Sequence, residues 1–97
     1  MKVLHTDKAP AAVGPYSQAI EVNGFVFCSG QLPIDPATGV FAEGGVKEQT
    51  RQSILNAQEV LRSAGLELSN VAKTTVYLSD MDNFAAMNEV YAQFFSC

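Results

Sequence analysis

The first third of the chain carries short runs rich in apolar residues, separated by turn residues, and such runs predict β-strands. Residues 17–22 and 25–31 form two such runs. Asn23-Gly24 lies between them and is the dipeptide most typical of a tight hairpin turn. Residues 3–5 could add a short edge strand. The pattern therefore predicts a small antiparallel sheet near the N-terminus.

The middle of the chain shows the period of a helix. Apolar and small residues recur at spacings of three and four over residues 46–64, which predicts an amphipathic helix that ends at Gly65. The opposite face carries charged and amide side chains, as a solvent-facing surface would. The expected buried stripe consists of Val46, Thr50, Ile54, Ala57, Leu61 and Ala64.

The last third of the chain predicts one more strand and one more helix. Residues 71–78 are rich in β-branched side chains and are typical of a strand. Residues 83–95 have a helical period, and Asp80 or Asp82 could cap this helix by accepting backbone N–H bonds. The order β-β-β-α-β-α indicates a single α+β domain over residues 1–97, with both helices packed on one face of a sheet.

Composition narrows the classes of partner. Charged residues make up 16% of the chain, below the roughly 25% of an average globular protein, which suggests that part of the surface is buried against other subunits. A net charge of −4 argues against a nucleic acid or an anionic membrane as partner. The sequence has no apolar run long enough to span a membrane, and its first residues lack the apolar core of a signal peptide.

The cysteines and the histidine offer little chemistry. Cys28 and Cys97 do not form a disulfide-rich pattern, so we expect reduced thiols in a cytoplasmic protein, with Cys28 packed in the core. His5 is the only histidine, and the chain has no Cys-x-x-Cys pair, so we expect no metal site.

The hairpin brings candidate site residues together. Its turn places the Tyr16 end of one strand beside the Ser29 end of the next, with Gly30 allowing a ligand to approach the backbone. Each residue also has a purely structural interpretation. Tyr16 could close the end of the core, Ser29 could bond to local backbone, and Gly30 could mark a bulge.

Asn88 is the third candidate side chain. It lies on or beside the apolar stripe of the second helix, where an amide must find hydrogen-bond partners. It could bond to the backbone of a neighbouring loop or contact a ligand. Position alone leaves both interpretations open.

Several blocks of sequence, in register and in order from Met1 to about Phe95, resemble the YjgF/RidA/UK114 family of reactive-intermediate deaminases. Agreement over several blocks is far more specific than any single one. The blocks are Gly14-Pro15-Tyr16-Ser17-Gln18-Ala19, Ser29-Gly30-Gln31, Asp35-Pro36-Ala37-Thr38-Gly39 and Met87-Asn88-Glu89-Val90-Tyr91.

The resemblance implies a chorismate-mutase-like (YjgF-type) fold and a homotrimer with a central barrel-like core and clefts between adjacent subunits. It implies hydrolysis of 2-imino acids and their enamine tautomers, such as 2-iminobutanoate or 2-aminoacrylate, to 2-oxo acids and ammonia, without a cofactor. The matching site positions are Tyr16, Ser29, Asn88 and, for substrate binding, the backbone of Gly30. Asn88 and Ser29 would orient substrate or water, and Tyr16 would close the cleft.

The chain also departs from the family. It ends at Phe95-Ser96-Cys97, whereas family members continue through a Pro-Ala-Arg segment, whose arginine anchors the substrate carboxylate, and through the last two strands. Neither Arg51 nor Arg62 matches that arginine. We therefore expect inner strands without a backbone partner. A non-catalytic module of the same fold that binds small carboxylates or proteins is the alternative function, and an inactive, incomplete chain is a further possibility.

Overall fold

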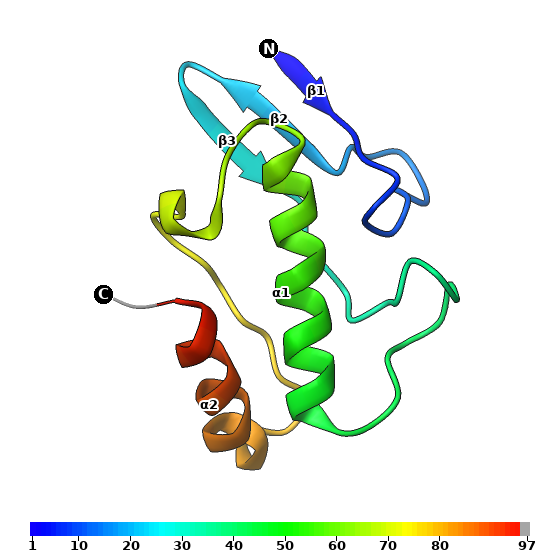
Figure 1. The fold of residues 1–97 in the computed structure, drawn as a ribbon, viewed down its shortest axis with the longest axis vertical. Coiled ribbons are helices and arrows are strands. Elements are labelled where there is room, and N and C mark those ends of the chain that lie inside the picture. The colour runs from blue at the N-terminus through cyan, green and yellow to red at the C-terminus, as the bar shows by residue number, and fades with distance from the viewer. Residues whose placement is uncertain (96–97) are drawn as a thin grey trace.

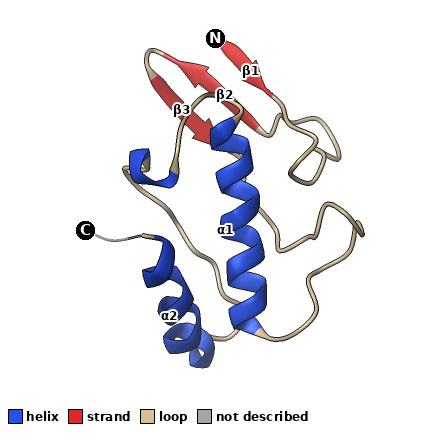
Figure 2. Ribbon diagram, in the orientation of Figure 1, coloured by secondary structure: helices blue, strands red, loops and turns tan. Residues whose placement is uncertain are grey.

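The computed structural model describes residues 1–95. Three short strands form a sheet at one end of the molecule, and two α-helices lie side by side (Figures 1 and 2). Two short 3-10 turns lie between the helices and flank residues 71–80. In chain order the elements are β1 (Lys2–Leu4), β2 (Ala19–Val22), β3 (Phe25–Cys28), α1 (Val46–Arg62), η1 (Leu68–Asn70), η2 (Met81–Asn83) and α2 (Phe84–Phe94).

The predicted hairpin is confirmed. The sheet has the order β1-β2-β3 with antiparallel neighbours, and Val22 pairs with Phe25 across the turn. The two turn residues, Asn23 and Gly24, have φ values of 51° and 80°. Positive φ at both positions is the geometry of the turn that matches the twist of the flanking strands, which is why Asn-Gly is favoured there.

One face of the sheet packs against α1. The core between them consists of buried Leu4, Ala9, Ala19 and Val60, with Val26 and Ala64 packed at its margin. Val60 is fully buried. Because side chains alternate along a strand, the opposite sheet face carries Val3 and the two aromatic side chains of β3.

That opposite face is exposed and apolar. Val3, Phe25 and Phe27 retain 60%, 66% and 59% of their accessible surface, and the rings of the two phenylalanines lie 6.4 Å apart. Exposed clusters of large apolar side chains are typical of surfaces that contact another protein.

The second helix packs along α1 rather than on the sheet (Figure 1). Met87 and Val90 are its buried residues, and Lys47 of α1 forms an ion pair of 2.8 Å with Glu89 of α2. The Lys47 ammonium donates a hydrogen bond to this carboxylate and lowers the pKa of Glu89. Asp80 caps η2 and not α2 itself, because its carboxylate accepts a 2.9 Å bond from the Asp82 N–H at the start of η2, whereas the N-cap of α2 is Asn83, whose side chain makes no cap bond.

The prediction of a strand over residues 71–78 is wrong. This segment has no strand pairing in the structure, and most of its side chains are exposed. Its side-chain bond to α2 joins the Thr74 and Tyr91 hydroxyl groups at 2.6 Å. A strand exists only when a neighbour completes its hydrogen-bond ladder, and no described strand lies beside this segment. Residues 71–78 have the composition of a strand, but no described strand pairs with them.

The α+β class predicted from the sequence is confirmed by this arrangement. Within residues 1–95, neither helix combines the length and the apolar composition that crossing a membrane requires.

Candidate active site

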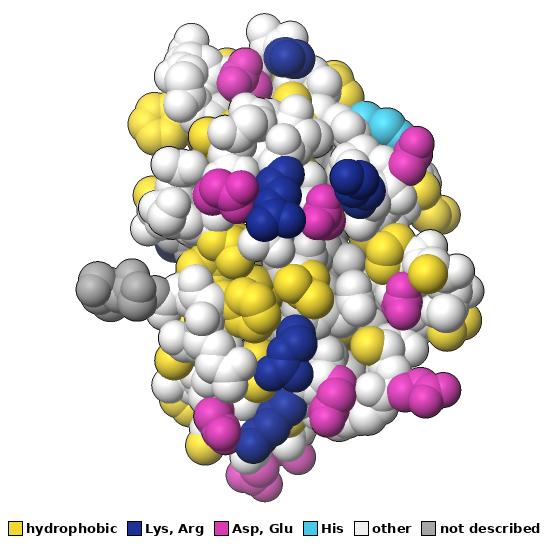
Figure 3. Space-filling model, viewed as in Figure 1, with side chains coloured by type: hydrophobic (Ala, Val, Ile, Leu, Met, Phe, Trp, Pro, Cys, Tyr) yellow, Lys and Arg dark blue, Asp and Glu magenta, His cyan; other side chains and the backbone are white. Residues whose placement is uncertain are grey.

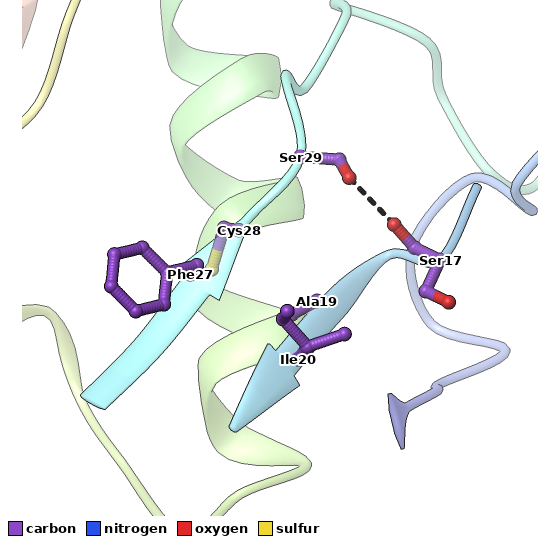
Figure 4. A pocket seen from close by; sticks show the side chains of 6 residues that line it. All are labelled: Ser17, Ala19, Ile20, Phe27, Cys28 and Ser29. Atoms are coloured by element: carbon purple, nitrogen blue, oxygen red, sulfur yellow. Dashed lines mark hydrogen bonds between the residues drawn. The ribbon is translucent and has the colours of Figure 1, made fainter. Parts of the chain in front are cut away.

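The two strands of the hairpin hold Ser17 and Ser29 together. The Ser29 hydroxyl donates a 2.6 Å hydrogen bond to the Ser17 carbonyl (Figure 4), and the Ser29 N–H donates a 3.0 Å bond to the Gln18 carbonyl. These two bonds continue the β2–β3 ladder beyond its last regular pair, Ala19 and Cys28. The position of Ser29 is therefore fixed by the hairpin itself.

A shallow depression of about 300 Å³ lies beside this pair of serines. Polar groups from the strand ends form one part of its wall, and apolar side chains from the strands form the rest (Figure 4). None of the lining side chains is cationic. The lining residues are Ser17, Ala19, Ile20, Phe27, Cys28 and Ser29.

The structural interpretation of Ser29 is confirmed, since its hydroxyl bonds to local backbone. This bond also determines which chemistry the hydroxyl can offer to a ligand. Its only hydrogen points to the Ser17 carbonyl, so the lone pairs of the oxygen are left to accept hydrogen bonds. Such an oxygen suits a water molecule or a protonated nitrogen.

Tyr16 lies next to this pair along the chain. Its N–H donates a 2.9 Å bond to the Gly14 carbonyl, which turns the chain sharply just before β2. The Tyr16 side chain is half exposed, at 50% of its surface. The tyrosine is therefore not a plug of the core, because a residue that filled the core would be buried.

Gly30 is exposed and open to approach. No atom lies within 4 Å of the position that a Cβ would occupy, and no bulge is recorded in the β2–β3 register. Within residues 1–95, no hydrogen bond uses the Gly30 N–H. This donor is thus free to reach a ligand next to Ser29, although Gly30 does not itself line the depression.

Asn88 is not brought to the other candidates within one chain. It is exposed on α2, which lies beside the half of α1 that is remote from the hairpin (Figure 1). No described residue forms a hydrogen bond with its side chain, so the loop-anchoring interpretation is wrong. Asn88 is exposed because α2 turns Met87 and Val90 towards α1, and Asn88 does not share their buried face.

The prediction that Cys28 packs in the core is wrong. Cys28 is exposed as a residue, because α1 covers Ala19 and Val26 but not the end of β3. Its thiol is partly shielded within the depression, and this desolvation raises the pKa of the Cys28 thiol. Cys97, the other cysteine, lies outside the described residues.

Sequence reasoning missed two buried amides near the site. Gln18 and Asn56 are 2% and 1% exposed. Gln18 accepts a 2.7 Å bond from the Thr6 N–H and donates to the Thr6 and Pro10 carbonyls at 3.0 and 2.9 Å, so it ties the preceding loop to β2. Hydrophobic periodicity cannot find such residues, because they are polar. The only available signal is an amide next to a buried residue, as Gln18 is next to Ala19.

Lysine and arginine side chains lie among acidic ones over the surface viewed in Figure 3. Arg62 pairs with Glu59 and Glu67, and Arg51 bonds to Gln93, so both arginines have partners away from the depression. Within residues 1–95, no cluster of three or more His, Cys, Asp and Glu side chains could hold a metal ion.

Comparison with known proteins identifies the family. The model of the family described as endoribonuclease L-PSP matches residues 6–97. A RutC family protein of Pyrococcus abyssi is 52% identical over 97% of this chain and 74% of its own length. The 2-iminobutanoate/2-iminopropanoate deaminase of Mus musculus is 48% identical over 97% of this chain and 70% of its own length.

Solved structures agree with this assignment. The YjgF gene product of E. coli superposes with a TM-score of 0.93 at 39% identity, over 98% of this chain and 74% of that one. This likeness confirms the predicted YjgF-type fold. The chain therefore belongs to the endoribonuclease L-PSP family, which is the YjgF/RidA/UK114 family that its sequence motifs resemble.

Proposed function

We propose that this chain hydrolyses 2-imino acids, and the enamines that tautomerise to them, to 2-oxo acids and ammonia without a cofactor. The observation that carries the proposal is its 48% identity to the mouse deaminase over 97% of the chain. Two groups support it: the Ser29 oxygen, which lines the depression, and the N–H of the next residue, Gly30, which is open to approach.

The chemistry needs few specialised groups. The carbon of a protonated imine is already electrophilic, so the protein mainly has to hold the substrate and a water molecule in reacting geometry. The water oxygen forms a bond to this carbon, and one water proton moves to the nitrogen. The carbon–nitrogen bond then breaks while the hydroxyl oxygen forms the carbonyl of the 2-oxo acid, and the hydroxyl proton leaves with ammonia as ammonium. In this proposal the Ser29 oxygen accepts a hydrogen bond from the water or the iminium N–H. The Gly30 N–H would donate to a substrate oxygen.

In this proposal Asn88 and Tyr16 contribute to the site only when subunits assemble. Since Asn88 and Ser29 lie apart within one chain, a site that uses both must combine residues of two subunits. We propose a homotrimer that places these sites at the subunit interfaces, with the exposed apolar sheet face as its central contact. Tyr16, half exposed beside Ser17, would close over the bound substrate.

The second candidate function is a non-catalytic module that binds small carboxylates or proteins. One observation favours it: no cationic side chain lines the depression, so nothing there matches the carboxylate anchor that the family resemblance implies. In either case the proposal places the protein in the cytoplasm. The exposed Cys28 thiol would stay reduced there.

Turnover and binding separate these functions. A dehydratase generates 2-iminobutanoate in the assay, and formation of 2-oxobutanoate is followed with and without this protein. An enzyme accelerates this step and loses the acceleration in Ser29→Ala and Asn88→Ala. Binding of 2-oxobutanoate without any acceleration would instead favour the non-catalytic module.

A further inference from the structure

Asn56 connects α1 to the segment that leaves the candidate site. Its side chain is 1% exposed in the middle of the helix. The Nδ2 group donates two hydrogen bonds, at 3.1 Å to the Leu32 carbonyl and at 2.8 Å to the Ile34 carbonyl. The Oδ1 atom accepts a 2.9 Å bond from Gln52 Nε2. Both donor hydrogens of this amide are therefore used on the chain that follows Ser29 and Gly30.

These two carbonyls lie at the base of a small hairpin-like loop. Ile34 pairs with Phe41 in an isolated bridge, and the loop is closed by two backbone bonds. The Asp35 N–H donates to Val40 at 2.9 Å, and the Ala42 N–H donates to Pro33 at 2.8 Å. Asn56 therefore holds the base of this loop and the exit of β3 with one side chain.

Packing holds only part of this segment, where Pro33 and Ile34 are half-buried. Leu32, Val40 and Phe41 retain 59%, 61% and 52% of their accessible surface, so their side chains are not anchored in a core. A segment with few buried apolar contacts opens easily unless polar bonds hold it. The fixed points of the segment are then the bonds of Ser29 to β2 at one end and those of Asn56 at the other.

We propose that Asn56 is a positioning residue, which fixes residues 31–34 against α1 and so determines where Ser29 and the Gly30 N–H lie in the site. An amide is required because both partners are carbonyl acceptors, and only an NH₂ group offers two hydrogens from one atom at this reach. The inference rests on the proposed function for its effect on turnover. Its effect on the loop is independent of that function.

The test compares Asn56→Ala with Val60→Ala in the full chain. Val60 is fully buried on the same helix, so its truncation weakens the core without touching residues 31–34. Two quantities are measured in conditions where both variants are folded. They are the hydrogen-exchange rates of the Asp35 and Ala42 amides, and kcat/KM for 2-iminobutanoate.

Asn56→Ala is expected to raise both exchange rates about tenfold or more, because the loop loses its anchor. It is expected to lower kcat/KM on the order of 100-fold, as a misplacement of about 1 Å can do. Val60→Ala should change neither quantity by more than about twofold once both variants are compared well below their unfolding temperatures. If Asn56→Ala does not fold, Asn56→Ser keeps one donor hydrogen and takes its place with the same expected directions.

Unchanged exchange at Asp35 and Ala42 would overturn the proposal, whatever the kinetics. Faster exchange with unchanged kcat/KM would also overturn it, since Asn56 would then hold the loop without affecting the site. If the wild-type chain shows no turnover, the proposed function fails separately. Binding of 2-oxobutanoate then replaces the kinetics: binding weakened in Asn56→Ala supports positioning, and equal or absent binding overturns it.

Discussion

The Ser29 hydroxyl donates its only hydrogen to the Ser17 carbonyl, across 2.6 Å between the ends of β3 and β2. This single bond has two consequences. It ties the strand ends together beyond the regular ladder, and it leaves the Ser29 oxygen as a pure acceptor that faces the depression. The Ser29 side chain therefore contributes both to the stability of the fold and to the proposed chemistry. Comparison with a control substitution separates the two contributions.

Replacement of Ser29 by alanine should affect both properties. We expect a loss of about 0.5–1.5 kcal/mol in the free energy of unfolding, because one part-buried hydrogen bond is removed. We also expect kcat/KM for 2-iminobutanoate to fall on the order of 100-fold, since the water or substrate loses an orienting contact. Denaturant unfolding and the coupled deaminase assay measure the two effects.

Ser63→Ala is the matched control for this substitution. The Ser63 hydroxyl donates to the Val60 carbonyl across the same 2.6 Å, at the end of α1 and outside the depression. Its loss should lower stability by a similar amount and leave kcat/KM unchanged. Equal activity of Ser29→Ala and Ser63→Ala would show that Ser29 has only a structural role.

Gly30 offers a substitution that the fold should tolerate. A Cβ at this position meets no atom within 4 Å, so Gly30→Ala should leave the unfolding temperature unchanged. By contrast, Gly24→Ala forces a φ of 80° on alanine and should cost about 1–2 kcal/mol. If the Gly30 N–H contacts substrate, the added methyl group raises KM for 2-iminobutanoate. An unchanged KM in Gly30→Ala would place this backbone outside the site.

Asn88 should matter for activity and not for stability. Its side chain is exposed and makes no hydrogen bond with the described residues, so Asn88→Ala should unfold at the same temperature as the wild type. Its deaminase activity should nevertheless fall on the order of 100-fold if Asn88 completes the site of a neighbouring subunit. Gln93→Ala, an exposed amide of the same helix, should retain full activity. Full activity of both variants would remove Asn88 from the site.

The exposed face of the sheet predicts self-association. Phe27 retains 59% of its surface there, and a lysine at this position would place a charge within an apolar contact. We expect the wild-type chain to have the mass of a trimer by light scattering and Phe27→Lys to be a monomer. Gln93→Lys adds the same charge on α2 and should keep the mass of the wild type. A monomeric wild type would contradict this prediction.

The hairpin and both helices could be predicted from the sequence because their signals are local. Asn23-Gly24 requires no distant partner to favour its turn, and the helical period of α1 is visible in the chain. Of the predicted buried stripe, only Ile54 and Leu61 are buried. The strand over residues 71–78 could not be predicted correctly, because composition shows which residues suit a strand and not whether another strand is beside them.

The site was predictable only in part, for a similar reason. The proximity of Ser29 to Ser17 and Gln18 follows from the hairpin turn, which is local. The burial of Asn56 follows from a loop that returns to α1 from a distant part of the chain. The exposure of Cys28 depends on where α1 stops covering β3. Such contacts depend on tertiary packing, which a local pattern does not contain.

The most direct measurement is the rate at which this chain converts 2-iminobutanoate, released by a dehydratase, to 2-oxobutanoate. A nucleophilic amine is added to the assay to trap free imine, and the amount of trapped product reports how much imine persists. The account predicts faster 2-oxobutanoate formation in proportion to the concentration of the chain, with less imine reaching the scavenger, and a much weaker effect for Ser29→Ala. A rate equal to that of spontaneous hydrolysis, at every concentration of the folded chain, would contradict it.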